Sequence, residues 1–143
     1  MRISALRGLA FLAVAAGALA LRLPSLGDKP MHGDEAIQAA KAARLWETGE
    51  AAYDPEGHHG LTLSYLTLPV LALGPARDFA ETEEWMYRLV PALAGTLLAL
   101  LPFLLADGLG FRAAAAAGAF TAVSPAFAYY SRYAIQEVLL VFF

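Results

Sequence analysis

Long apolar runs separated by polar segments dominate the chain. The first run carries no charge from Gly8 to Leu21 and continues past Arg22. A helix needs about 20 mostly apolar residues to cross a bilayer, and an arginine near its end can extend its charged head to the membrane surface. The pattern therefore predicts a first transmembrane helix within residues 1–24, spanning Ile3–Leu23.

A cleaved signal peptide is the alternative interpretation of this run. Arg2 and Arg7 would supply its basic start, and Ala18-Leu19-Ala20 has the small-x-small pattern of a cleavage site. The apolar runs farther along the chain favour a retained helix. In both cases the N-terminus is expected in the cytoplasm and the next segment outside it.

A polar segment covers residues 25–84. The helical spacing of its apolar positions predicts an amphipathic helix over Glu35–Thr48 along the membrane surface, ended by Gly49. The uncharged stretch Leu61–Ala76 is short and contains Pro69, so we expect a second membrane-surface helix there. A full crossing by this stretch is the alternative, and it would invert the orientation of everything downstream.

Residues 85–143 contain the remaining apolar runs. We expect a second span over Trp85–Ala106, a cytoplasmic polar turn over Asp107–Arg112 and a third span over Ala113–Tyr129. The run from Val138 stops without a polar flank, so it is expected to begin a fourth span of a larger membrane protein. The expected fold is therefore an all-α, polytopic bundle of transmembrane helices, present here as an N-terminal fragment.

Composition supports a membrane protein. Of the 143 residues, 59% are hydrophobic and only 16% are charged, against roughly 25% charged in soluble domains. The net charge of −3 offers no basic surface for nucleic acid, and the absence of cysteine excludes disulfides and thiolate chemistry. Residues 25–84 hold 11 acidic and 4 basic residues, so this segment is an acidic unit with a charge of −7.

The first candidate for chemistry is His32-Gly33-Asp34-Glu35, at the predicted start of a helix. A carboxylate at a membrane surface can accept the proton of an attacking hydroxyl or supply oxygen ligands to a divalent cation. The structural alternative is that Asp34 is only the N-cap of the helix, while Glu35 complements the helix dipole.

A second candidate is the loop from Tyr53 to Gly60. It holds the adjacent pair His58 and His59 close to acidic residues, a combination that can bind metal. Adjacent histidines point in different directions, however, and Pro55 with the loop glycines is typical of a solvated turn. Both interpretations of the loop stay open.

Two arginines beside apolar runs are further candidates. Arg132 precedes Glu137 in a polar and aromatic stretch, and arginine binds phosphate through two parallel hydrogen bonds. The alternative is an interfacial anchor with a local Arg132–Glu137 ion pair. Arg88 lies one turn inside the second predicted span, where it either marks a site or reaches the surface with its head group.

Several short motifs follow one another in a distinctive order. A first span leads to an Asp-Glu pair at a helix start, a Tyr-x-Pro…His-Gly loop and a short apolar helix. An acidic patch then leads to Arg88, and a span ending in Ser-Pro precedes a Tyr-Ser-Arg-Tyr…Glu stretch. This order resembles the N-terminal part of a GT-C-fold glycosyltransferase of the protein O-mannosyltransferase and aminoarabinose transferase superfamily. The similarity covers residues 5–143 and is strongest to prokaryotic flippase-activity-associated membrane proteins.

The resemblance implies an integral protein of the plasma (inner) membrane that uses a polyprenyl-phosphate-linked sugar. The acceptor would be a protein, lipid or glycan on the non-cytoplasmic face, and the fragment alone is expected to be inactive. Asp34 would be the catalytic carboxylate and Glu35 its paired acid. The substrate-binding candidates are His32, Tyr53, His58, His59, Arg88, Arg132 and Glu137. A divalent cation stays open as a cofactor.

The chain departs from the family pattern at two positions. His59-Gly60-Leu61-Thr62 stands where many relatives have a Pro or Lys-Pro-Pro pattern, and Glu137 stands where Asp is common. The first departure concerns the loop expected to contact the donor.

Two other classes of function stay open on the sequence. A transporter or flippase component would move a lipid-linked sugar without forming a glycosidic bond, and its ionisable groups would lie inside the bundle. A non-catalytic scaffold would bind a partner through the outer segment, and Asp34 would then be only a helix cap. The gathering of charge in one outer segment argues against the transporter, and a substitution of Asp34 would separate the enzyme from the scaffold.

Overall fold

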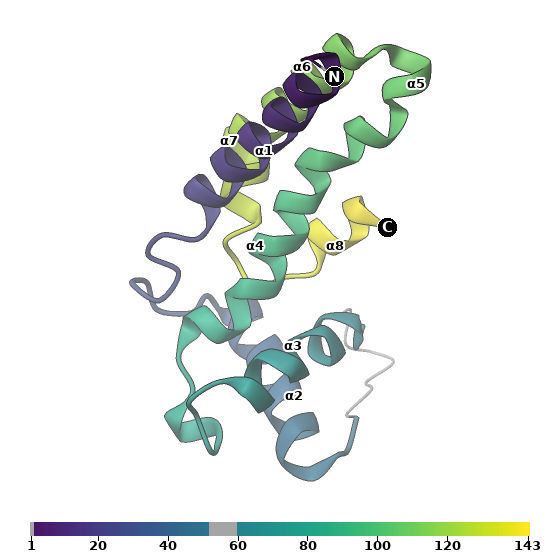
Figure 1. Ribbon diagram of the computed structural model, residues 1–143. Coiled ribbons are helices and arrows are strands. Elements are labelled where there is room, and N and C mark those ends of the chain that lie inside the picture. The colour runs from purple at the N-terminus through teal and green to yellow at the C-terminus, as the bar shows by residue number, and fades with distance from the viewer. Residues whose placement is uncertain (1, 52–59) are drawn as a thin grey trace.

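The computed structural model describes residues 2–51 and 60–143, and these residues form helices and connecting loops without strands (Figure 1). The all-α prediction is therefore confirmed. The helices are α1 (Arg2–Arg22), α2 (Gly33–Thr48), α3 (Thr62–Leu73), α4 (Glu84–Leu100), α5 (Ala106–Leu109), α6 (Phe111–Val123), α7 (Pro125–Tyr130) and α8 (Glu137–Phe142). Two short 3₁₀ helices, η1 (Phe79–Glu81) and η2 (Leu101–Leu105), precede and extend α4.

Helices α1, α4 and α6 form an elongated bundle whose contacts are made by small side chains. Ala18, Ala99 and Ala122 are buried against one another, with Val14 packed beside them. Small residues let helix backbones approach closely, as is common between helices in membranes. In the described part of the chain, two stretches are long and apolar enough to cross a bilayer, namely Ala5–Arg22 and Glu84–Leu109. They coincide with the first two predicted spans.

The predicted third span, Ala113–Tyr129, is not one continuous helix. It is divided into α6 and α7 at Ser124, whose φ and ψ of −58° and 122° leave the helical region. Pro125 has no N–H to donate to Thr121 and its ring crowds the preceding turn, which explains the break. Both helices contact α1 and run alongside it (Figure 1).

Helices α2 and α3 pack together in a smaller unit at one end of the bundle (Figure 1). Ala39 and Ala42 of α2 are buried against Leu71 of α3 and against Met86 and Tyr87 at the start of α4. Helix α3 has 12 residues, a rise of about 18 Å. It is too short to cross a hydrocarbon core of about 30 Å, in line with the predicted surface helix.

Helix α2 begins at Gly33, two residues before the predicted start. Its N-cap is His32, whose Nδ1 accepts a hydrogen bond from the Asp34 N–H. The interpretation of Asp34 as the N-cap is therefore wrong, because Asp34 lies inside the first turn. The predicted end at Gly49 is confirmed: its φ of 72° is left-handed and its N–H bonds to the Leu45 carbonyl.

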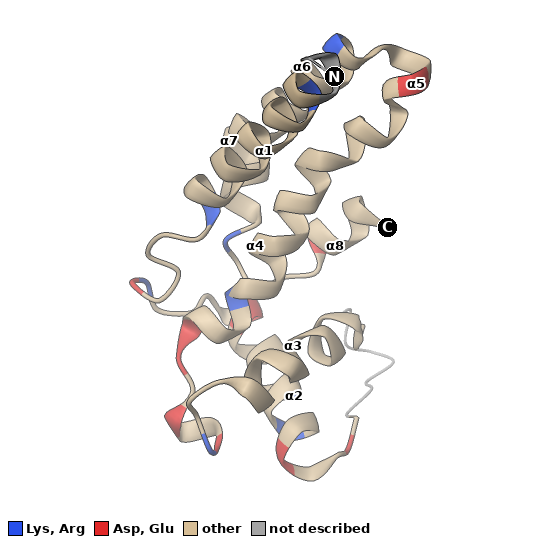
Figure 2. Ribbon diagram, viewed as in Figure 1, with Lys and Arg blue, Asp and Glu red and all other residues tan. Residues whose placement is uncertain are grey.

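Charge is distributed unevenly between the two ends of the molecule. Acidic residues gather around α2, η1 and the loops beside them, while the middle of the bundle is nearly free of charge (Figure 2). One exception is Arg22 at the end of α1, which is fully buried. The expectation that Arg22 extends to the membrane surface is wrong, because its guanidinium bonds to groups inside the bundle.

Candidate functional site

A buried ion pair between Arg88 and Glu35 joins α4 to α2. Arg88 Nε lies 2.8 Å from Glu35 Oε1, and Arg88 Nη2 lies 3.0 Å from Glu35 Oε2. The side chains are 4% and 0% exposed. Parallel bonds of this kind fix both the distance and the relative orientation of the two groups.

The remaining donors of Arg88 hold the connector between α1 and α2. Nη1 donates to the carbonyls of Leu26 and Lys29 at 2.7 and 2.8 Å, and Nη2 also donates to the Pro30 carbonyl at 3.2 Å. A guanidinium has five N–H donors, and all five are therefore used within the protein. Arg88 does not reach the surface as its alternative interpretation required, and it has no donor left for a substrate phosphate.

Glu35 is held on all sides. Besides Arg88, its Oε1 accepts from the Ala134 N–H at 2.8 Å and its Oε2 accepts from the His32 N–H at 3.0 Å. Burial alone would raise the pKa of the Glu35 carboxyl, but the hydrogen bonds from Arg88, Ala134 and His32 outweigh burial and hold that pKa below its ordinary value. Glu35 is therefore an ionised, fully bonded anchor of the α2 N-terminus.

Asp34 is the neighbour of this anchor and has the opposite environment. Its side chain is 57% exposed, and its Oδ2 lies 3.7 Å from His32 Nδ1. Helix α2 directs Glu35 into the protein and leaves the Asp34 carboxylate open to solvent. The sequence pair Asp-Glu thus separates into one exposed carboxylate and one buried, structural carboxylate.

The loop of residues 131–136, between α7 and α8, connects the elements around this pair. Ala134 binds Glu35 of α2, while the Gln136 side chain bonds to both the N–H and the carbonyl of Gly60, just before α3. Arg132 Nη2 donates to the carbonyls of Pro24 and Ser25 at 2.7 and 3.4 Å. One short loop therefore fixes the end of α1 and the beginnings of α2 and α3.

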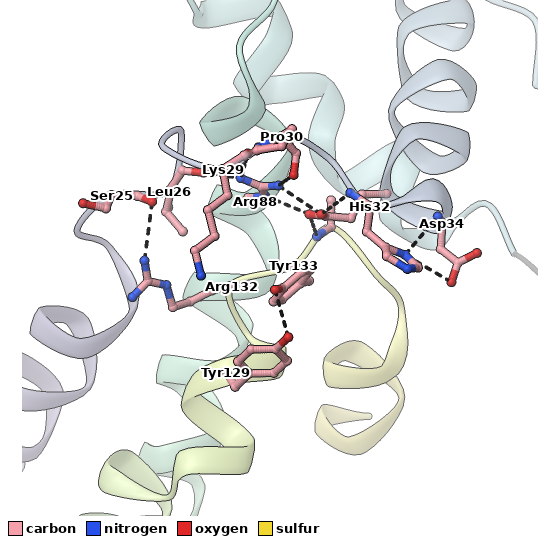
Figure 3. A network of polar contacts seen from close by, with 12 residues as sticks. Ser25, Leu26, Lys29, Pro30, His32, Asp34, Arg88, Tyr129, Arg132 and Tyr133 are labelled. Carbon is pink, nitrogen blue, oxygen red and sulfur yellow. Dashed lines mark hydrogen bonds and ion pairs between the residues drawn. The ribbon is translucent and has the colours of Figure 1, made fainter.

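Arg132 also borders a hollow of about 220 Å³ between the end of α1 and α7. Lys29 and the two tyrosines Tyr129 and Tyr133 line it as well, and the tyrosine hydroxyls are 2.9 Å apart. Figure 3 shows Asp34 and Arg132 on opposite sides of Arg88. The structure therefore does not bring these two predicted site residues into one pocket.

The other predicted site residues are placed as follows. His32 and Asp34 share the α2 start, and Arg88 and Glu35 lie buried beneath it. Glu137 is exposed at the beginning of α8, and no ion pair joins it to Arg132 among the described residues, so the expected local pair is wrong. Tyr53, His58 and His59 lie outside the described residues.

Sequence reasoning missed two members of the site. Ala134 acts through its backbone N–H, and a pattern of side chains in the sequence cannot predict such a role. Gln136 is a polar residue beside an apolar run, and that position was a usable signal. Across residues 2–51 and 60–143, no three histidine or acidic side chains come together as a metal site.

Comparison with known proteins gives one match. The family model described as dolichyl-phosphate-mannose-protein mannosyltransferase matches residues 60–143, more than half of the chain. No curated protein and no solved structure matches the chain. The matched region contains Arg88 and the 131–136 loop, which are the two elements that hold the Asp34–Glu35 helix start. The chain therefore belongs to the dolichyl-phosphate-mannose-protein mannosyltransferase family and is a membrane glycosyltransferase of the mannosyltransferase type.

Proposed function

We propose that the chain forms the outer catalytic end of an enzyme that transfers a sugar from a polyprenyl-phosphate donor to an acceptor hydroxyl. Asp34 is the general base in this proposal. The observation that carries it is the contrast at the α2 start, where an exposed carboxylate stands beside a locked one. Family membership supports the reaction class.

In the proposed reaction, an Asp34 carboxylate oxygen accepts the proton of the acceptor hydroxyl. The hydroxyl oxygen forms a bond to the anomeric carbon of the sugar. The bond between that carbon and the phosphate oxygen breaks, and its electron pair leaves with the lipid phosphate. A positioned general base contributes about 10² to 10⁴-fold to such a step.

Glu35 and Arg88 have a positioning role in this proposal. All the oxygen lone pairs of Glu35 face N–H donors of the protein, so Glu35 is not placed to accept a substrate proton. The pair instead fixes the first turn of α2 and thereby the direction of Asp34. His58 and His59 stay predictions as partners of the donor phosphate.

We also propose the orientation that the charges favour. Arg7 lies over the ring of Phe111 at 5.4 Å, so the start of α1 and the start of α6, with Arg112, share one end of the bundle. Basic residues next to short turns face the cytoplasm. The acidic unit of α2 and α3 then lies on the opposite, non-cytoplasmic face of the plasma membrane, where the acceptor would be.

The test is Asp34→Asn in the full-length protein that contains this chain, assayed in membranes supplied with radiolabelled polyprenyl-phosphate mannose. We expect transfer into the protein fraction to fall at least 100-fold, with thermal unfolding unchanged because Asp34 is exposed. Asp107→Asn, an exposed acid of α5 that is not part of the segment bonded to Arg88, is the matched control and should keep full activity. Wild-type transfer by the Asp34 variant would overturn the assignment, and assays with and without a chelator would show whether a divalent cation takes part.

A further inference from the structure

Arg22 is a fully buried cation in the interior of the bundle. Among the described residues, no carboxylate lies within ion-pair distance of it. A buried charge without a counter-ion is costly unless hydrogen bonds compensate for the lost water. The hydrogen-bond partners of Arg22 therefore indicate which part of the structure this residue stabilises.

Two of these partners are carbonyls at the break between α6 and α7. Arg22 Nη1 lies 2.9 Å from the Ala122 oxygen, and Nη2 lies 3.4 Å from the Thr121 oxygen. In a continuous helix these oxygens would accept from the N–H groups of residues 125 and 126. Residue 125 is proline and has no N–H, and the first backbone bond of α7 runs from Ala128 to Ser124. The guanidinium thus takes the place of the helical donors that the break removes.

Of the two other partners, one is the Ala18 carbonyl of α1 itself, at 3.2 Å from Arg22 Nη1, and the other lies in the 131–136 loop. Arg22 Nε donates to Ser131 Oγ at 3.3 Å, and Ser131 Oγ donates to the Phe127 carbonyl within α7. Three residues later, Ala134 donates its N–H to Glu35. A short chain of bonded groups therefore leads from the buried Arg22 to the residue next to Asp34.

Gly95 of α4 leaves space for the contact between Arg22 and Ser131. A methyl group added at Gly95 would collide with the side chain of Ser131 and would lie 3.1 Å from Arg22 Nε. Helix α4, which also carries Arg88, therefore packs directly against the Arg22–Ser131 contact. Helix α4 therefore contacts this chain of bonded groups at two places: Gly95 lies against the Arg22–Ser131 contact, and Arg88 binds Glu35.

We propose that Arg22 is a positioning residue for the reaction at Asp34. It caps the broken helix at Pro125 and fixes α7 and the 131–136 loop, so that Ala134 meets Glu35 and the first turn of α2 is held in place. This inference rests on the proposed role of Asp34. Arg22 itself touches no substrate.

The test combines Arg22→Met with Pro125→Ala in the full-length protein that contains this chain. In Arg22→Met, amide hydrogen exchange over residues 126–134 should rise at least tenfold and kcat for mannose transfer should fall at least tenfold. Pro125→Ala restores an N–H that can donate to the Thr121 carbonyl. The double variant should therefore recover part of both losses, whereas independent effects would add. Arg44→Met, which removes an exposed arginine of α2, is the control and should change neither readout.

Three other results would decide between a positioning role and a merely structural role of Arg22. If Arg22→Met lowers only the yield of folded protein, while the folded fraction exchanges and turns over like the wild type, the positioning role is overturned. If Arg22→Met does not fold, Gly95→Ala keeps the arginine but displaces Ser131, and it should reproduce the exchange and kcat changes; wild-type behaviour would overturn the proposal. If the wild type transfers no sugar from polyprenyl-phosphate donors, the proposed function fails, and the exchange measurements still decide the role of Arg22.

Discussion

Arg88 and Glu35, 53 residues apart in the chain, meet in a bidentate ion pair shielded from solvent, with N–O distances of 2.8 and 3.0 Å. The pair joins the first turn of α2, which lies outside the bundle, to the beginning of α4, the second predicted span. It therefore sets the position of the outer unit relative to the bundle. Its neighbour Asp34 remains exposed as a consequence of the same helix geometry.

Glu35→Gln is expected to lower the free energy of unfolding by about 3–5 kcal/mol, the usual result of breaking one side of a buried pair. The amide group would place N–H donors against the donors of Arg88 or Ala134. Thermal and denaturant unfolding of the purified full chain would measure this loss. The matched control is Glu50→Gln, which breaks the exposed Arg44–Glu50 pair and should cost less than about 1 kcal/mol. Equal effects of the two variants would contradict the structural role of Glu35.

Stability should fall as the medium is acidified below about pH 4. The pKa of Glu35 is lowered in the folded protein, against about 4.3 for an unperturbed glutamate. The folded state therefore binds fewer protons than the unfolded state, so the contribution of Glu35 is complete above the unfolded pKa and is lost as pH falls through the folded pKa. Unfolding measured between pH 7 and pH 3 would show this loss. The Glu35→Gln variant should show a flatter profile in that window, and an unchanged profile would contradict the prediction.

Gly49→Ala should destabilise α2 by roughly 1–2 kcal/mol. Gly49 has a φ of 72°, a left-handed conformation in which a side chain is strained, and its N–H closes the helix on Leu45. Gly33→Ala, at the other end of the same helix, meets no atom within 4 Å and should change stability by less than about 0.5 kcal/mol. Hydrogen exchange of the α2 amides would compare the two variants. Similar hydrogen exchange in the two variants would argue against the role of Gly49 as the left-handed C-cap of α2.

Gly118→Ala is expected to push α6 away from α4. The added methyl group would lie 2.8 Å from the Ala99 carbonyl oxygen and 3.0 Å from the Phe103 ring, and overpacking of this kind costs about 1–3 kcal/mol. Gly17→Ala on α1 meets nothing within 4 Å and serves as the control. Thermal unfolding of the two variants measures the difference. A neutral Gly118→Ala would show that α4 and α6 do not pack as described.

The sequence by itself determined the two long apolar helices and the C-terminal end of α2. Runs of apolar residues identify α1 and α4, because a bilayer requires uninterrupted apolar length. Gly49 identifies the end of α2, because glycine tolerates the left-handed cap. The pair Asp34-Glu35 indicates a candidate site. The sequence predicted one continuous span over Ala113–Tyr129, however, and the break of this stretch at Ser124 appeared only in the structure.

The tertiary structure alone decided which residues share the site and in what role. Local spacing does not distinguish Asp34 from Glu35. Only the approach of Arg88 and the Ala134 N–H makes one carboxylate buried and fully bonded while the other stays exposed. Arg22 reads as a surface arginine at the end of an apolar run, but packing against α6 and α7 buries it. The reason is physical: hydropathy along a chain reports the cost of transferring each residue, whereas burial of a charge depends on which distant groups supply its hydrogen bonds.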